Sequence, residues 1–358
     1  MSFDKRVRRL RRATSDEKID ALLMTNLTNI QYLTGFKGSF ALLLVTPKET
    51  VFLTDFRYIE TAQRTVPADE VIKTSLDHFE DIKRETRKRN IRRLGFESKT
   101  ITHADFLRLA AKVGKRNLAP LKDTVETLRM IKEDGEVAQI RKAIGLTQRA
   151  LSHLRKFLEP GVSEKDLALE LEVFFKLNGG GETGFLPIVA FGERSSMPHY
   201  ASSGRKLKMG DMVLVDLGTS VNGYHADLTR TWLSPTMKGK QKEIYNIVLE
   251  AQQAAIERIK PGVDLVSIDR AARQVIAKRG YGEKFGHGLG HGLGLNVHEL
   301  PRISPRSEGK CRKGMVVTIE PGIYLPGWGG VRIEDDVLVT ENGCRVLSSF
   351  PRSPRAFL

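Results

Sequence analysis

The sequence contains only two cysteines, Cys311 and Cys344, among its 358 residues. Two cysteines cannot build a disulfide framework or a thiolate metal cage, which excludes a disulfide-rich secreted scaffold. Long apolar runs are also missing: the longest, 40–45, has about six residues, far fewer than the roughly 18 that a membrane span needs. The basic N-terminus is not followed by the apolar core of a signal peptide. We therefore expect a cytoplasmic protein that does not bind membranes.

Basic side chains are more numerous than acidic ones, with 58 Lys and Arg against 43 Asp and Glu, which gives a net charge of +15. Such an excess permits an acidic partner but does not require one, because a basic helix face is usually just solvated. The densest basic segment, 83–93, lacks the interleaved aromatic residues that single-strand binding uses. Nucleic acid is therefore not expected as a partner.

The length fits two domains. In the first third of the chain, short apolar runs alternate with charged helical patterns, which predicts an α/β layer with a mostly parallel sheet. The strands are expected at 21–24, 41–45, 51–54 and 91–96, and the helices at 57–65 and 77–90. The pattern changes within 122–129, so the expected domains are 1–125 and 126–358.

The second domain shows the order helix, helix, strands twice, which predicts an α+β fold with an internal pseudo-twofold repeat. Helices are expected at 132–158, from 163 to the glycines 179–181, at 238–260 and at 264–278. Strands are expected at 212–217, 224–232, 315–319 and 331–339.

Two carboxylates flank a hairpin turn in the first half of this domain. Asp216 and Asp227 lie on strands that are separated by the turn residues Asn222-Gly223, so they should face each other within about a residue of register. Like charges in that position are destabilising unless a cation, a shared proton or a basic partner is present. For this hairpin alone, a solvated turn with one carboxylate paired to Arg230 remains an alternative.

The second half repeats the arrangement. Glu320 ends the strand 316–319, a loop rich in glycine and proline follows at 321–330, and Glu334 lies in the next strand. The midpoint between the two glutamates is Gly327, so they can also face each other. Four converging carboxylates would be prohibitive in a core without cations, and hard oxygen ligands in that number suit one or two divalent metals.

Histidines and glycines gather in the segment 285–299. Glycines allow the backbone to approach a ligand or a second strand closely, and no P-loop Lys-Ser/Thr follows that would indicate a nucleotide site. A metal ligand with a neighbouring catalytic imidazole is the predicted use of His291 and His298. His199, in the polar loop 195–200, is a further candidate. Four other histidines are expected to serve core packing: His78, His103, His153 and His225.

Together, these motifs resemble the pita-bread metallopeptidase superfamily, in its aminopeptidase P and prolidase branch. The matching segments are 198–199, 215–218, 227–231, 287, 291–295, 298–299, 319–322 and 331–335. The segments 29–36 and 53–58 are similar to the small creatinase-like domain of that branch. The resemblance covers nearly the whole chain, and it implies a creatinase-like α/β domain followed by a pita-bread catalytic domain.

The resemblance implies a centre of two divalent metal ions, with Mn²⁺ favoured and Co²⁺ or Zn²⁺ as alternatives. Asp227 and Glu334 would bridge the ions, Asp216 would hold one, and His291 with Glu320 the other. Glu320 would also accept the proton of the attacking water.

Further roles follow from the same resemblance. His199 and His298 would stabilise the tetrahedral oxyanion and handle the peptide nitrogen, and His287 would shape the substrate pocket. Arg332 would steady a metal carboxylate. A homodimer is also implied.

The implied reaction is hydrolysis of the bond between a first residue and a following proline, as in an Xaa-Pro aminopeptidase acting on peptides with proline at the second position. Arg302 resembles the residue with which prolidases anchor the free carboxylate of a dipeptide, so an Xaa-Pro dipeptidase is the alternative. The other use of Arg302 is a structural salt bridge in a loop.

Three further alternatives are less favoured by the residues. A non-catalytic pita-bread protein that binds nucleic acid or protein would not need all five metal ligands. A methionine aminopeptidase usually lacks the N-terminal domain. Creatinase shares the fold but works without metals.

Overall fold

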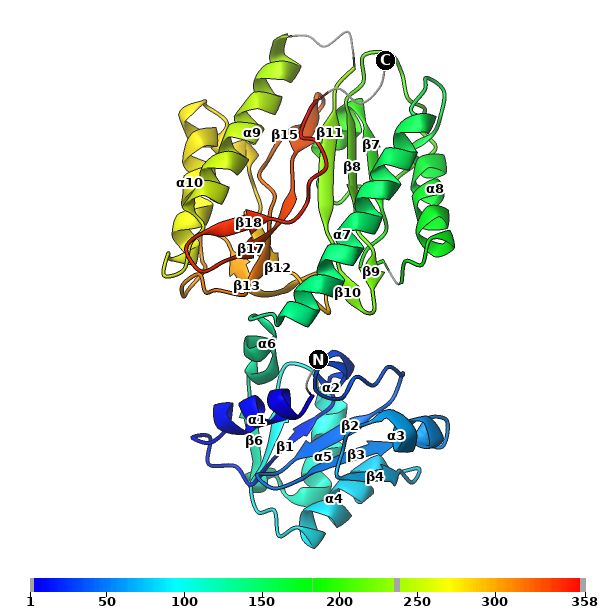
Figure 1. Ribbon diagram of the computed structural model, residues 1–358, viewed down its shortest axis with the longest axis vertical. Helices are drawn as coiled ribbons and strands as arrows, with labels where there is room; N and C mark the ends of the chain where they lie inside the picture. The colour runs from blue at the N-terminus through cyan, green and yellow to red at the C-terminus, as the bar shows by residue number, and fades with distance from the viewer. Residues whose placement is uncertain (1–2, 182, 235–238, 355–358) are drawn as a thin grey trace. The chain divides into compact units, whose positions relative to one another are not determined.

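The computed structural model describes residues 3–181, 183–234 and 239–354. The chain forms two compact units, Met1–Arg129 and Met130–Leu358 (Figure 1). None of the helices within the described ranges has the length and apolar character that crossing a membrane requires.

The first unit contains a six-stranded sheet in the order β4-β3-β2-β1-β5-β6. Its strands are β1 (Ala21–Met24), β2 (Leu42–Val45), β3 (Thr50–Thr54), β4 (Glu70–Lys73), β5 (Leu94–Glu97) and β6 (Leu118–Leu121). Its helices are α1 (Phe3–Ala13), α2 (Leu27–Thr34), α3 (Ile59–Thr65), α4 (His78–Lys88), α5 (His103–Val113), η1 (Lys115–Asn117) and α6 (Thr124–Arg129).

Most strand pairs of this sheet are parallel, as expected, but two are antiparallel. β1 pairs antiparallel with β2, and β2 with β3, whereas the other neighbouring strands run parallel. The β2–β3 pair is antiparallel because its connection is short, and Thr46 closes it by donating its N–H to Glu49 O at 2.9 Å. A turn of this length can only join antiparallel strands.

The chain divides after Arg129, a few residues beyond the boundary expected at 125. The cause is α6, a short helix that packs against α1 and α2 and buries Val125 and Arg129 within the first unit.

The second unit contains two helix pairs, each followed by strands. The first half has α7 (Asp134–Leu154), η2 (Arg155–Phe157), α8 (Glu164–Leu177), β7 (Ile188–Phe191), η3 (Gly192–Ser196), β8 (Val213–Leu217), β9 (Ser220–Val221), β10 (Tyr224–His225) and β11 (Leu228–Trp232). The second half has α9 (Gly239–Arg258), α10 (Leu265–Lys278), η4 (Gly282–Lys284), β12 (Gly290–Gly292), β13 (Glu299–Ile303), β14 (Val316–Ile319), β15 (Gly322–Leu325), β16 (Gly329–Arg332), β17 (Asp335–Val339) and β18 (Cys344–Val346). This order matches the predicted repeat.

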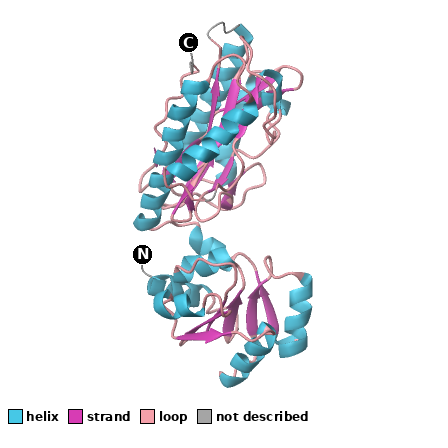
Figure 2. Ribbon diagram, turned by 90° about the vertical axis from the view of Figure 1, so that its right-hand side faces the viewer, coloured by secondary structure: helices cyan, strands magenta, loops and turns pink. Residues whose placement is uncertain are grey.

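Each helix pair covers its own sheet. The buried faces of α7 and α8 pack on the sheet β11-β8-β7, and those of α9 and α10 pack on the sheet β13-β12-β14-β17-β18. In Figure 1 the two helix pairs flank the strands of this unit on opposite sides, and Figure 2 shows the helices running alongside the strands. The strands that carry the candidate ligands therefore lie between the two helix pairs.

Two strands predicted as continuous are interrupted. The strand expected at 224–232 breaks at 226–227, and the one expected at 331–339 breaks at 333–334. At these points the backbone changes partner: Asp227 N–H donates to Asp336 Oδ2 at 3.3 Å, and Glu334 N–H donates to Thr229 O at 3.1 Å. Most of the loop expected at 321–330 is instead the hairpin β15–β16.

Candidate metal centre

The first acidic hairpin is offset from the predicted register. The backbone partner of Asp216 is Thr229, not Asp227, because the turn is centred on the left-handed residues Asn222 and Gly223. Side chains alternate along a strand, so residues 227 and 229 point to the same face. Asp216 and Asp227 are therefore diagonal neighbours on one face rather than a directly opposed pair.

The two glutamates of the second hairpin are opposed. In the β14–β17 ladder Ile319 pairs with Asp335, and in the β15–β16 ladder Gly322 pairs with Arg332. Glu320 and Glu334 lie between these two ladders, at matching positions of the same register.

His291 reaches the site from β12, between two glycines. A Cβ atom at Gly290 would overlap the carbonyl oxygen of Thr318, and one at Gly292 would overlap that of Leu300. The glycines therefore allow β12 to lie close against β14 and β13. The Nδ1 atom of His291 is 3.1 Å from Gly292 O, and assigning the ring proton to this bond leaves Nε2 as an acceptor that faces the carboxylates.

Ligand atoms from three separate segments of the chain meet at this point. One donor atom each of Asp227, His291 and Glu334 lie within 4.8 Å of one another. His291 Nε2 is 3.6 Å from Asp227 Oδ2 and 3.4 Å from Glu320 Oε1. Asp227 and Glu334 are only 5% and 2% exposed.

Burial and mutual repulsion disturb the ionisation of these groups. Desolvation first, and then the neighbouring carboxylates, raise the pKa of Asp227 and of Glu320 well above their usual values, and that of Glu334 to about 8. Desolvation lowers the pKa of His291 to about 4. The arrangement is therefore costly in the charged state unless positive charge is supplied.

The donor set fits a divalent cation. Carboxylate oxygens and one neutral imidazole nitrogen are acceptors, the kind of atom that such ions bind. Asp216 Oδ1 is buried and finds no hydrogen-bond partner among the residues that the structure describes. Its other oxygen accepts a hydrogen bond from Arg332.

Arg332 links several of these groups. Its buried guanidinium donates to Asp216, to Thr229 Oγ1 at 3.1 Å and to the hydroxyl of Tyr324 at 3.0 Å. Thr229 Oγ1 in turn donates to Glu334 Oε2 at 2.6 Å. Arg230, the alternative partner for one aspartate of the first hairpin, instead forms an ion pair with Asp335.

The other candidate residues surround this cluster. The rings of His298 and His291 are 4.3 Å apart, and His287 Nε2 is 2.9 Å from the hydroxyl of Tyr324. After desolvation, the charge of His199 is a further cause that lowers the pKa of His298, so the two rings lie within electrostatic range. Arg302 is the backbone partner of His291 across β12 and β13.

Sequence reasoning missed Tyr324, because the segment that carries it resembled a loop. It also overestimated the burial of one histidine: His103 is exposed at the start of α5. His78 does pack between the aromatic rings of Phe40 and Phe79.

Comparison with known proteins gives the family. The model of metallopeptidase family M24 matches residues 138–341, and that of the creatinase/prolidase N-terminal domain matches residues 6–131. An Xaa-Pro dipeptidase of Pyrococcus horikoshii is 35% identical over 354 residues, which cover 98% of both chains.

Two solved structures are similar over almost their whole length. The Xaa-Pro dipeptidase from Bacillus anthracis has a TM-score of 0.96 and 38% identity, with 99% of both chains covered. The X-Pro aminopeptidase from Thermotoga maritima has a TM-score of 0.88 and 36% identity, with 96% of this chain and 99% of that chain covered. These matches confirm the predicted creatinase-like and pita-bread architecture, and the chain belongs to metallopeptidase family M24.

Proposed function

We propose that this metallopeptidase is an Xaa-Pro dipeptidase, which hydrolyses the bond between a first residue and a C-terminal proline. The observation that carries the proposal is the pairing of Arg302 with His291. Directly opposed residues of an antiparallel pair project from the same face with Cβ atoms about 4.5–5.5 Å apart. The Arg302 side chain therefore extends from a backbone position next to a candidate metal ligand. A guanidinium there can bind the free carboxylate of a dipeptide in bidentate fashion.

In this proposal five side chains hold two divalent ions: Asp216, Asp227, His291, Glu320 and Glu334. Asp227 and Glu334 would be shared ligands of this centre, and Mn²⁺ would be favoured over Co²⁺ and Zn²⁺. Two such ions, when bound, lower the pKa of a water molecule and polarise the scissile carbonyl group. The convergence of donor atoms and the unpartnered oxygen of Asp216 support this assignment.

Other catalytic roles in this proposal belong to side chains of the protein. The Glu320 side chain is 18% exposed, more than those of Asp227 and Asp216, so it is the carboxylate most open to a water molecule and serves as the proton acceptor. His298 and His199 are exposed beside the cluster and donate hydrogen bonds to the developing oxyanion and to the peptide nitrogen. His287, held by Tyr324, shapes the pocket.

An Xaa-Pro aminopeptidase is the second candidate. It is favoured by the exposure of Arg302, which leaves room for a substrate that extends beyond the proline. The name of the Thermotoga maritima relative points the same way.

Kinetics on one metal-defined sample test these proposals. The protein is stripped with a chelator and reloaded separately with Mn²⁺, Co²⁺ or Zn²⁺, with metal content measured on the same sample. We expect kcat/KM for Ala-Pro to exceed that for Ala-Pro-Ala by at least about tenfold, since a hydrogen bond between charged groups contributes about 1.5–3 kcal/mol. Ala-Ala is the control for proline. Faster cleavage of the tripeptide would favour the aminopeptidase, and no cleavage with any metal would contradict both candidates.

We also propose that the protein is a homodimer, as the resemblance implies. Sedimentation equilibrium over a range of concentrations measures its mass, and a monomer at all concentrations would contradict this proposal.

A further inference from the structure

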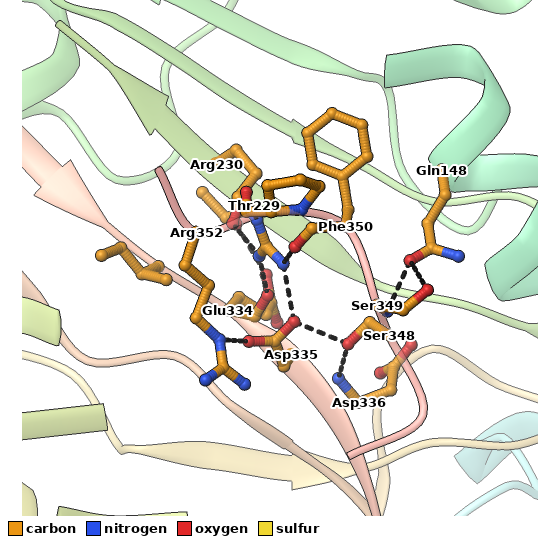
Figure 3. Close-up of polar contacts among 12 residues, drawn as sticks. Gln148, Thr229, Arg230, Glu334, Asp335, Asp336, Ser348, Ser349, Phe350 and Arg352 are labelled. Carbon is orange, nitrogen blue, oxygen red and sulfur yellow. Dashed lines mark hydrogen bonds and ion pairs between the residues drawn. The ribbon is translucent and has the colours of Figure 1, made fainter. Parts of the chain in front are cut away.

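A buried arginine lies behind the candidate metal centre. Arg230 is 0% exposed, and all five of its side-chain N–H groups have acceptors. Nη1 donates to Glu334 O at 2.6 Å and Thr229 O at 2.9 Å, Nη2 to Asp335 Oδ1 at 2.8 Å and Phe350 O at 2.7 Å, and Nε to Pro351 O at 3.1 Å (Figure 3). The guanidinium therefore joins the backbone of one candidate ligand to the C-terminal segment.

Asp335, the residue after Glu334, is the ionic partner at the centre of this network. It is 0% exposed and accepts four hydrogen bonds. The donors are Arg230, Ser348 Oγ at 2.7 Å, Arg352 Nε at 2.6 Å and Gln252 Nε2 at 3.0 Å. Two guanidinium groups compensate its charge, which is the condition under which a carboxylate can be buried.

Gln252 connects the network to the second glutamate. It lies on α9, fully buried beside apolar residues of that helix. Besides Asp335, its Nε2 donates to Ile319 O at 3.2 Å and to Ile333 O at 3.1 Å. These carbonyl groups belong to the residues immediately before Glu320 and Glu334. One amide group therefore forms hydrogen bonds to both backbone segments that carry these carboxylates.

The C-terminal segment completes the network. Leu347 N–H donates to Asp336 O at 2.8 Å, the hydroxyl of Tyr245 donates to Arg352 O at 2.7 Å, and Leu233 N–H donates to Pro354 O at 2.7 Å. Figure 3 shows Ser348, Phe350 and Arg352 converging on Arg230 and Asp335. The segment is thus bonded to both halves of the second unit.

We propose that Arg230, Asp335 and Gln252 are positioning residues that hold Glu320 and Glu334 at the separation a divalent ion requires. In this role, residues 348–352 are part of the same clamp. The inference rests on the proposed metal centre. Repulsion between the clustered carboxylates acts to spread the two strands, and the clamp opposes it by fixing the backbone before and after Glu334. Groups that orient metal ligands typically change metal affinity by about 10–100-fold when they are removed.

Cobalt binding by the full-length protein tests the clamp. Metal-free protein is titrated with Co²⁺ against a competing chelator, and the visible absorption of the bound ion reports its geometry. Gln252→Met keeps the side-chain length and removes the amide, so we expect affinity to fall at least tenfold and the cobalt spectrum to change. Gln253→Met is the matched control on the same helix, because Gln253 is exposed. It should leave both readouts unchanged.

A milder variant keeps the test decisive if Gln252→Met fails to fold. Arg352→Gln removes one ion pair to Asp335 from a side chain that is 27% exposed, and it should lower affinity by about half as much on a logarithmic scale. Arg6→Met controls for general destabilisation, because it removes a buried guanidinium from the first unit and should leave cobalt affinity unchanged.

The outcomes separate the clamp from the metal centre. Wild-type affinity and spectrum in folded Gln252→Met, or in Arg352→Gln if the former does not fold, would overturn the clamp alone. Equal cobalt binding by the wild type and Asp227→Ala would instead overturn the proposed metal centre, and the clamp with it.

Discussion

Arg302 and His291 are direct partners across the antiparallel strands β13 and β12. The positive charge of Arg302 is one of the minor causes, after desolvation, that lower the pKa of His291 and of His298. Arg302 therefore acts electrostatically on both imidazoles of the centre, although its own side chain is exposed. This electrostatic proximity supports the proposal that Arg302 binds the free carboxylate of a dipeptide.

Replacing this arginine should affect dipeptides selectively. In Arg302→Met we expect KM for Ala-Pro to rise about 10–100-fold, which corresponds to the loss of a hydrogen bond between charged groups. The tripeptide Ala-Pro-Ala should change little, because its carboxylate lies one residue further away. Steady-state kinetics on both substrates measure the difference, with the exposed Arg306→Met as control. An equal loss on both substrates would indicate a structural role for Arg302.

The Asp227 carboxylate should destabilise the metal-free protein and be required for metal binding. Asp227→Asn removes one charge from a cluster of buried carboxylates, so the metal-free variant should be more stable than the metal-free wild type by about 1–2 kcal/mol. Saturating Mn²⁺ should stabilise only the wild type, since a ligand stabilises the state that binds it. Urea unfolding with and without Mn²⁺ measures both effects. A variant that Mn²⁺ still stabilises, or that still cleaves Ala-Pro, would remove Asp227 from the ligands.

The exposed histidines should affect turnover without affecting metal content. His298→Ala and His199→Ala should each lower kcat about 100-fold or more, the usual effect of losing a hydrogen-bond donor to an oxyanion. Metal analysis of the same samples should show wild-type Mn²⁺ content. His103→Ala, at an exposed site in the first unit, is the control. Loss of metal in His298→Ala would make that residue a ligand instead.

The sequence predicted the helix pairs well, because their signals are local. Apolar residues at helical spacing indicated these helices. The Pro-Gly pairs at 160–161 and 261–262 lie close to the observed ends of α7 and α9. The turn at 222–223 was also predicted where it occurs. The first helix, α1, was not expected, because Val7 and Leu10 are its only buried apolar residues and the remainder of the helix is mostly charged.

Long-range pairing was harder to predict than local structure. The alternation of apolar and polar residues in the segment 331–339 does not show that the backbone changes partner at Glu334, where the N–H donates to Thr229 O. The glycines and prolines of 321–330 concealed the hairpin that carries Tyr324. Gln252 gave no signal either, because one glutamine in a helical pattern is normally exposed. These features depend on which strands meet in the folded chain.

Burial of the His287 imidazole lowers its pKa to about 4. The folded protein therefore keeps this imidazole neutral at pH values at which the unfolded chain, with a pKa near 6.5, is protonated. The unfolded state binds more protons between pH 6.5 and 4, so stability is lost as the pH falls through this range.

Between pH 7 and 5, the free energy of unfolding of the metal-free wild type should fall by about 2 kcal/mol more than that of His287→Gln, at 1.36 kcal/mol per pH unit below 6.5. Urea unfolding followed by tryptophan fluorescence reports on the second unit, since Trp232 and Trp328 are the two tryptophans of the chain. The carboxylates titrate in both proteins and cancel in the difference. Parallel pH curves for the wild type and His287→Gln would show that the imidazole is not kept neutral by burial.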